Sequence, residues 1–232
     1  MCGLVGVISP NLNHEITLGM VKDSQRLISH RGEDSQEIHL DKLNNLCIAF
    51  NRLAIVDLDK RSNQPMKYIH KNKSIIGMMN GEIYNYKELK KELINDGYFF
   101  NTDSDTEVFL AFILSKGINS INKINGIFGA FIFDEKNKKF YLIRDQIGVK
   151  PIYYLKNNSL FNFVFASEIK AFKPFIDLRP SINQLSEFCC FGETSSDKTI
   201  YENIYQVEPG HYIEISLNEK KIFNNVQYFS LF

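Results

Sequence analysis

Apolar residues occur in short runs along the chain, and polar or glycine-containing segments separate these runs. The run at 3–9 predicts a buried strand, and the near-helical spacing of apolar residues over 15–29 predicts a helix. The polar segment 30–36 contains a glycine and indicates a loop. Two further apolar runs, 45–51 and 52–58, predict strands, so this part of the chain combines one helix with three strands.

The next part of the chain predicts one strand followed by two helices. The apolar run 74–80 predicts the strand. A helix over 86–96 follows, with Asn85 as its expected N-cap. The second helix begins at "SDTE", where Ser104 and Glu107 have the spacing of a capping box, and a glycine ends it.

The second half of the chain is rich in strand-like runs with little alternation, which is typical of sheets covered on both faces. We expect strands at 127–134, 139–145, 150–155, 161–168, 211–216 and 226–230, and helical segments at 168–175 and 182–191. Strands and helices come in clusters rather than in strict alternation. The pattern therefore favours sheets packed on each other with helices outside, and not a doubly wound parallel fold.

The composition limits the possible functions. The 232 residues suffice for one large domain, and no repeat or long linker divides them. The 27 basic and 27 acidic residues balance, so no net charge attracts nucleic acid or an anionic membrane. No apolar run approaches the roughly 20 residues that span a bilayer. We see no signal peptide and expect a cytoplasmic protein.

Cysteine and histidine residues show none of the usual metal-ligand spacings, and the phosphate-binding glycine motifs are missing. We therefore expect neither a metal nor a cofactor in this domain. Cys47, Cys189 and Cys190 lie in apolar strand or helix patterns, and we expect them to be buried packing residues.

Cys2 stands immediately before the first predicted strand. Its position alone favours a packing role, because a small apolar thiol beside a strand usually fills space. If Met1 is removed, however, Cys2 carries a thiol and an α-amine on one residue. That pair could serve as a nucleophile with its own base.

Asn80 and Gly81 end the predicted strand at 74–80 and allow two interpretations. Asn-Gly is a strong turn dipeptide. Alternatively, the Asn80 side-chain amide and the Gly81 backbone N–H could form an oxyanion hole, where glycine lets the backbone approach a substrate closely.

Three charged residues could together recognise a free amino acid. Arg52 interrupts an apolar run and either finds a structural partner or binds a carboxylate with its planar guanidinium. Asp105 lies in the first turn of a predicted helix and either complements the helix dipole or binds an ammonium. With Glu82, these residues offer one cation and two anions, the set that an α-carboxylate and an α-ammonium require.

Eight ordered motifs resemble the class II glutamine amidotransferase domain, and within that class the asparagine synthetase branch. The motifs are "MCG", "SHRGED", "NRLAIVDLDKRSNQPM", "NGEIYN", "SDTE", "NGIFGAFIFD", "IRDQIGVKPIYY" and "FASEIKAF". The resemblance runs in unbroken order from residue 2 to residue 232. It implies an α+β fold, a four-layer αββα sandwich of the N-terminal nucleophile hydrolase type.

The resemblance also implies hydrolysis of L-glutamine to L-glutamate and ammonia through a γ-glutamyl thioester on Cys2, with its freed α-amine as base. Asn80 and Gly81 would form the oxyanion hole. The substrate-binding residues would be Arg52, Leu53, Ile55, Val56, Glu82 and Asp105. His30, Arg31 and Gly32 would shape the loop over the site, whereas Arg144 and Asp145 would be structural or interdomain residues.

Two features depart from the family pattern. Glu33 stands where the family loop usually has proline, which frees the backbone φ angle and adds a negative charge near an expected carboxylate site. We expect somewhat weaker glutamine affinity as a result. The ATP-dependent synthetase domain of this branch is also absent from these residues, so ATP and Mg²⁺ would belong only to such a domain or to a partner chain.

The sequence also allows two alternatives to a glutaminase. The domain could bind glutamine as a regulatory module without turnover, or it could hydrolyse another amide on the same fold. Glutamine binding without glutamate release would favour the first, and a substrate panel would identify the second.

Overall fold

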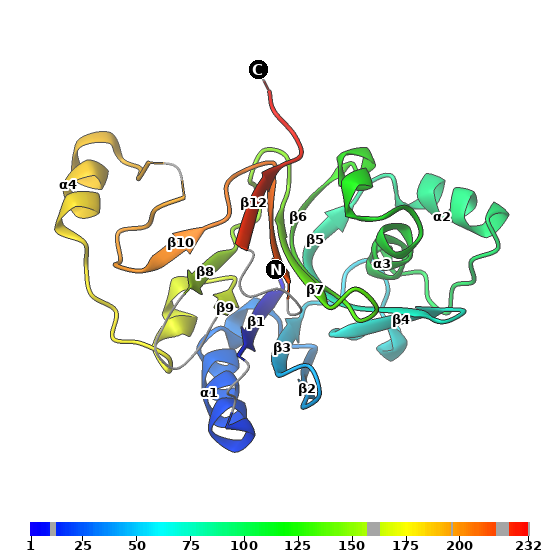
Figure 1. Ribbon diagram of the computed structural model, residues 1–232, viewed down its shortest axis with the longest axis horizontal. Helices are drawn as coiled ribbons and strands as arrows, with labels where there is room; N and C mark the ends of the chain where they lie inside the picture. The colour runs from blue at the N-terminus through cyan, green and yellow to red at the C-terminus, as the bar shows by residue number, and fades with distance from the viewer. Residues whose placement is uncertain (10–12, 157–162, 196, 217–222, 232) are drawn as a thin grey trace.

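Within the described part of the chain, the strands form two antiparallel sheets of six strands each (Figure 1). The computed structural model describes residues 1–9, 13–156, 163–195, 197–216 and 223–231. Sheet A has the order β10-β8-β9-β1-β3-β2, and sheet B has the order β12-β11-β7-β6-β5-β4. The strands of sheet A are β1 (Gly3–Ile8), β2 (Ser35–Asp41), β3 (Leu46–Arg52), β8 (Tyr153–Lys156), β9 (Phe163–Ala166) and β10 (Ile204–Gln206). Those of sheet B are β4 (Met66–His70), β5 (Lys73–Ile83), β6 (Gly126–Asp134), β7 (Lys139–Arg144), β11 (His211–Ser216) and β12 (Phe223–Gln227).

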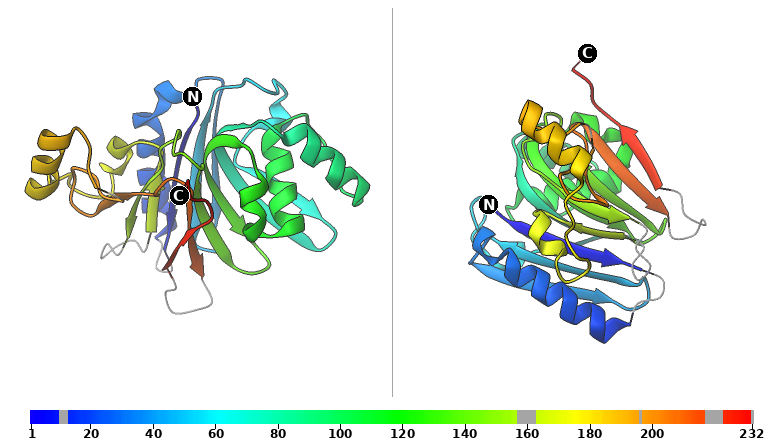
Figure 2. Two further views of the ribbon diagram at one scale, coloured as in Figure 1. Left: turned by 90° about the horizontal axis from the view of Figure 1, so that it is seen from above. Right: turned by 90° about the vertical axis from the view of Figure 1, so that its left-hand side faces the viewer.

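Helices cover the outer faces of the two sheets (Figures 1 and 2). The α-helices are α1 (His14–Leu27), α2 (Tyr86–Asn95), α3 (Asp105–Lys116) and α4 (Ile182–Phe191). The short 3₁₀ helices of the described residues are η1 (Ser29–Arg31), η2 (Lys60–Ser62), η3 (Ile118–Lys123) and η4 (Ile169–Phe172). Helix α1 packs on sheet A, and α3 packs on sheet B and on α2. Among the described residues, no helix is long and apolar enough to cross a membrane.

Three apolar cores hold these layers together, which confirms the predicted αββα sandwich. One lies between sheet A and α1, one lies between sheet B and its helices, and the third lies between the two sheets. Strand β1 shows why its sequence lacks alternation: Leu4 faces the core between the sheets, whereas Val5 faces the core under α1. Across the sheets, the rings of Phe131 and Phe165 stack with centroids 4.5 Å apart.

The structure corrects several predicted elements. Residues 53–58 are not a strand, because the chain leaves sheet A at Arg52 and curls into a loop. The predicted helix at 168–175 shortens to the 3₁₀ turn η4. The predicted strand at 161–168 begins outside the described residues and continues as β9. Three short strands, β2, β4 and β10, were not predicted.

The helix caps agree only in part with the prediction. The Ser104 side chain accepts from the backbone N–H of Thr106 and caps α3. The Glu107 carboxylate does not close a capping box on Ser104. It accepts from the backbone N–H groups of Asn101 and Thr102. Asn85 precedes α2, but its side chain bonds to Lys123 and Asn125 and makes no capping hydrogen bond.

The prediction for the cysteine pair in α4 was wrong. Cys189 and Cys190 are exposed, and none of the ten residues of α4 is buried. The helix lies at one side of the molecule, away from both sheets (Figure 1). Its apolar pattern therefore does not correspond to core packing within the described part of the chain. Cys47 is buried in β3 as expected, and burial raises the pKa of its thiol to about 12.

Candidate active site

One small pocket, with a volume of about 110 Å³, lies where the N-terminal end of β1 meets β5. All nine residues assigned to the site from the sequence line it: Cys2, Arg52, Leu53, Ile55, Val56, Asn80, Gly81, Glu82 and Asp105. These residues come from sheet A, from the loop after β3, from sheet B and from α3. The pocket therefore forms only when both sheets and a helix assemble.

The Cys2 thiol lies against the loop that follows β3. The backbone N–H of Leu53 donates to Cys2 Sγ at 3.3 Å, and the thiol lies 3.6 Å from the Leu53 carbonyl oxygen as a donor. Burial raises the pKa of the Cys2 thiol, although the Leu53 hydrogen bond and nearby positive charges oppose this effect. The thiol therefore needs a base before it can attack a carbon. Met1 lines the same pocket, so its removal would both expose the Cys2 α-amine and widen the pocket.

Arg31 and Glu168 hold the backbone of Cys2. Arg31 Nε donates to the Cys2 carbonyl oxygen at 2.8 Å, and its Nη1 donates to Glu168 Oε1 at 2.8 Å. His30 Nε2 also lies 2.9 Å from Glu168 Oε1. The sequence indicated a loop-shaping role for Arg31, but Glu168 was not assigned a role. Its motif "FASEIKAF" was the only signal that could have identified it.

Asn80 and Gly81 lie within β5 and face the pocket. Asn80 is 2% exposed, and its buried Nδ2 has no hydrogen-bond partner among the described residues. A buried donor without a partner is costly, so it marks a place where a ligand acceptor would be stabilised. Gly81 has φ +153°, and a Cβ there would lie 1.9 Å from the Ile127 carbonyl oxygen. Only glycine fits this backbone.

Arg52 is 7% exposed and organises the loop after β3. Its Nη1 donates to the Asp59 carbonyl oxygen at 3.1 Å and to Asn63 Oδ1 at 2.8 Å, and its Nη2 donates to the Asp57 carbonyl oxygen. These bonds use three of the five N–H donors of a guanidinium. Arg52 therefore stabilises the loop through these hydrogen bonds and also brings a positive charge to the lining of the pocket.

Two carboxylates lie on the other side of the pocket. Asp105 is 5% exposed at the start of α3, and its Oδ2 accepts from the Ile83 backbone N–H at 2.9 Å. Burial raises the pKa of Asp105, and the neighbouring charge of Glu82 acts in the same direction. A bound ammonium would relieve both effects, because an opposite charge favours the ionised carboxylate.

The segment 53–56 is held over the pocket by the loop that contains Glu33. Asp34 Oδ2 accepts from the Ala54 backbone N–H at 2.7 Å, and the Asp34 N–H donates to the Arg52 carbonyl oxygen at 3.0 Å. At Gly32 a Cβ would lie 2.5 Å from backbone atoms of Asn51 and Arg52. The close approach of these two loops therefore requires glycine.

Five polar pocket residues were not assigned a role from the sequence, although all five lie inside the quoted motifs. They are Asp57, Ser62, Gln64, Thr106 and Lys150. Gln64 links two layers, since its Oε1 accepts from the Met79 N–H at 2.6 Å and its Nε2 donates to Thr106 Oγ1 at 3.2 Å. The predicted structural role of Arg144 and Asp145 agrees with their contacts. Fully buried Asp145 accepts from the backbone N–H groups of Phe128, Val149 and Lys150.

The comparison with protein families identifies the class to which this fold and pocket belong. The family described as "Glutamine amidotransferase domain" matches residues 1–229. The chain therefore belongs to the glutamine amidotransferase family.

Individual relatives show which members of the family the chain is similar to. The chain is 37% identical over 232 residues to asparagine synthetase (glutamine-hydrolyzing) 2 of Bacillus subtilis, covering 95% of this chain and 30% of that protein. It is 31% identical to putative asparagine synthetase (glutamine-hydrolyzing) 2 of Methanocaldococcus jannaschii, covering 96% and 45%. It is also 29% identical to amidase chry2 of Gibberella zeae, covering 95% and 33%. The chain thus spans less than half of the length of each of these relatives.

The fold matches a solved glutamine phosphoribosylpyrophosphate amidotransferase from B. subtilis with a TM-score of 0.68. The match covers 99% of this chain and 50% of that chain at 21% identity. At this identity the likeness establishes the fold alone, and it supports the N-terminal nucleophile type of sandwich inferred from the sequence.

Proposed function

We propose that this pocket hydrolyses L-glutamine to L-glutamate and ammonia, with Cys2 as the nucleophile after removal of Met1. The observation that carries the proposal is the convergence on one pocket of the Cys2 thiol, the Asn80 Nδ2 without a partner among the described residues, the Arg52 guanidinium and the carboxylates of Glu82 and Asp105. Arg52 would bind the α-carboxylate, while Glu82 and Asp105 would bind the α-ammonium. The backbone of Leu53, Ile55 and Val56 would line the substrate's path.

The freed α-amine of Cys2 is a suitable base. An α-amine has a pKa of about 7.7–8.0, so a substantial neutral fraction exists near pH 7. It takes the thiol proton as sulfur attacks the side-chain amide carbon, and the carbonyl electrons move onto oxygen. Asn80 and Gly81 stabilise that oxyanion. The leaving nitrogen takes up that proton from the α-ammonium and departs as ammonia as the C–N bond breaks, which leaves a γ-glutamyl thioester. Water then hydrolyses the thioester to glutamate and the free thiol.

The deciding experiment measures glutamate release from L-glutamine by protein whose intact mass confirms the loss of Met1. Cys2→Ala, processed in the same way, is the matched control. We expect turnover in the parent and none in the variant. Equal release by both proteins would contradict Cys2 as nucleophile, and no release by the parent would favour a glutamine-binding module.

We further propose that the ammonia serves an ATP-dependent synthetase of the asparagine synthetase type, in the same protein or in a partner chain. The names and greater lengths of the relatives support this proposal. The ammonia acceptor would be aspartate or another carboxylate, and ATP and Mg²⁺ would act in that synthetase, with no cofactor needed in this domain. If glutamine supported amidation by the assembled enzyme no better than added ammonium salt, this coupling would be contradicted.

A second candidate function is hydrolysis of a different amide, for which the relative named an amidase is the motivating observation. The charged set Arg52, Glu82 and Asp105 favours a free amino acid instead. Glutamine, N-acyl glutamine and simple amides, compared as substrates at equal concentration, separate these two functions.

The four free cysteines agree with a reducing, cytoplasmic location, which we also propose.

A further inference from the structure

The two charged anchors of the pocket lie on different layers of the molecule. Arg52 ends β3 in sheet A, whereas Asp105 begins α3 on the outer face of sheet B. An amino acid can bind to both anchors only when their separation is fixed. A direct contact between the loop after β3 and the start of α3 would help to fix that separation.

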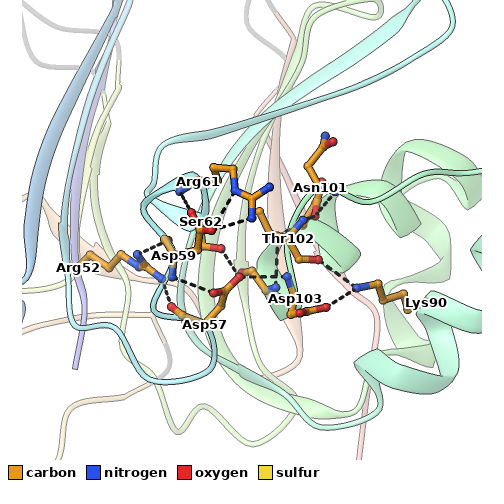
Figure 3. A network of polar contacts seen from close by, with 11 residues as sticks. Arg52, Asp57, Asp59, Arg61, Ser62, Lys90, Asn101, Thr102 and Asp103 are labelled. Atoms are coloured by element: carbon orange, nitrogen blue, oxygen red, sulfur yellow. Dashed lines mark hydrogen bonds and ion pairs between the residues drawn. The ribbon is translucent and has the colours of Figure 1, made fainter.

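Asp57 makes that link with its main chain and its side chain (Figure 3). Its carbonyl oxygen accepts from Arg52 Nη2. Its carboxylate Oδ2 accepts from the backbone N–H of Asp103, two residues before Asp105, at 3.0 Å. The same oxygen accepts from Ser62 Oγ at 2.6 Å, and Oδ1 accepts from the Asp59 N–H at 2.9 Å.

The segment before α3 is also held from its other side. Lys90 Nζ donates to the Thr102 carbonyl oxygen and to Asp103 Oδ1, each at 3.0 Å (Figure 3). Asp57, in the loop after β3, and Lys90, in α2, thus both hydrogen-bond to the short segment before α3. The hydrogen bond from Ser62 is the main cause that lowers the pKa of Asp57, so its carboxylate is ionised near neutral pH and accepts all three bonds.

We propose that Asp57 is a positioning residue that fixes the spacing between Arg52 and Asp105, and thereby makes the site prefer ligands that carry both an α-carboxylate and an α-ammonium. This inference rests on the proposed function for the roles of Arg52 and Asp105. Asp57 acts through these two residues.

Asp57→Asn tests the link with little change in size. An amide has one acceptor oxygen and two N–H donors, so it cannot receive the bonds from Ser62, Asp59 and Asp103 together. Asp134→Asn is the matched control. Asp134 also accepts from two backbone N–H groups and one side-chain amide, but it lies in β6 five residues beyond the partner of Asn80.

The binding measurement uses the Cys2→Ala background without Met1, so that no turnover occurs. L-glutamine is titrated beside glutaramate, which lacks the α-ammonium, and 4-aminobutanamide, which lacks the α-carboxylate. We expect Asp57→Asn to weaken L-glutamine binding about tenfold, as loss of one charge-assisted hydrogen bond would. Binding of each one-anchor ligand should change less than about twofold, and Asp134→Asn should leave all three unchanged.

Steady-state kinetics with active protein distinguish a positioning role from a general loss of structure, because only a positioning role should change KM and leave kcat unchanged. Asp57→Asn should raise KM for L-glutamine about tenfold and leave kcat within about twofold, because Cys2 and Asn80 are not among its contacts. The proposal would be overturned if Asp57→Asn weakened the binding of all three ligands equally, or if Asp134→Asn had the same effect as Asp57→Asn. A fall in kcat at constant KM would overturn it as well.

The outcome separates this proposal from the proposed function. A parent that binds L-glutamine but does not release glutamate contradicts the hydrolase, while the binding comparison still decides the role of Asp57. No binding of L-glutamine to the Cys2→Ala protein overturns both. If Asp57→Asn fails to fold, Ser62→Ala takes its place, with a loss of about threefold in L-glutamine affinity expected and an unchanged affinity contradicting the link.

Discussion

Asn80 carries a buried side-chain amide at the pocket that Cys2 also lines, and its Nδ2 has no hydrogen-bond partner among the described residues. We predict that Asn80→Ala lowers kcat for glutamine hydrolysis by about 10²–10³, with a much smaller effect on KM. The loss falls on kcat because the donor meets an oxyanion that exists only during the reaction. Thermal unfolding should change little, since no hydrogen bond from Nδ2 is lost. A variant with the same kcat but lower stability would contradict the oxyanion role.

Glu33 offers a second prediction at the same scale. Gly32 before it has φ −166° and ψ 113°, an extended conformation that a following proline permits. We predict that Glu33→Pro lowers KM for glutamine, because the loop over the pocket stiffens and loses a negative charge near the expected carboxylate site. Steady-state kinetics test this, with Glu33→Gln separating the charge from the stiffness. A KM for Glu33→Pro equal to or above that of the parent would contradict it.

At the scale of elements, the sequence predicted what local periodicity determines and missed what distant contacts determine. The helices α1, α2 and α3 and the strands around β5 and β6 follow their apolar patterns. Residues 53–58 have the composition of a strand, yet Arg52 binds the carbonyl oxygens of Asp57 and Asp59 and curls the chain. No property of the segment itself indicates that bend.

The contrast between local patterns and distant contacts also explains which site residues could be assigned from the sequence. The nine assigned residues lie in motifs that a family resemblance identifies, and the structure places them around one pocket. Asp57 and Glu168 act through partners 46 and 137 residues away, Asp103 and Arg31. Such contacts are determined by tertiary packing, so the motifs mark where these two residues lie but not which partners they bind.

The contact between Arg31 of η1 and Glu168, the residue just before η4, predicts a dependence on pH. Burial alone would raise the pKa of Glu168, but hydrogen bonds from Arg31 and Lys170 outweigh it and hold the pKa below its usual value. The contact therefore stabilises the protein fully above about pH 4.3 and loses this contribution as pH falls through the folded-state pKa. The free energy of unfolding of the parent should exceed that of Glu168→Gln at pH 7.

That difference should shrink as the pH falls below about 4, because protonated Glu168 resembles glutamine. Denaturant unfolding of both proteins at pH 7, 5, 4 and 3 measures it, and the comparison cancels the titration of other carboxylates. A difference that stays constant over this range would contradict the assignment. Glu168→Gln should also lower kcat/KM, because Arg31 would hold the Cys2 backbone less firmly.

At the scale of the whole molecule, the site depends on the distance between the two sheets. Cys2 extends from β1 in sheet A, and Asn80 lies in β5 of sheet B. The layer between them includes the stacked rings of Phe131 and Phe165. The clustering of strands in the sequence predicted packed sheets, but only the structure shows that a glycine in β1 leaves the space that Phe165 and Ile48 of the same sheet fill.

That glycine is Gly6 in the middle of β1. A Cβ there would lie 2.3 Å from the Phe165 ring and 2.7 Å from Ile48 Cγ2, so one of these side chains would have to move. We predict that Gly6→Ala lowers the free energy of unfolding by about 1–3 kcal/mol, the usual cost of overpacking a core. It should also lower glutamine turnover, because any displacement of β1 moves Cys2 relative to Asn80.

Gly19 in α1 is the matched control, since a Cβ there meets nothing within 4 Å. Gly19→Ala should raise the free energy of unfolding by about 0.5–1 kcal/mol, because alanine favours the helix, and should leave turnover unchanged. Urea unfolding and glutamate release for both variants test the pair. If Gly6→Ala proved as stable and as active as the parent, the close packing of Phe165 and Ile48 over Gly6 would not be what determines the position of β1 and of Cys2.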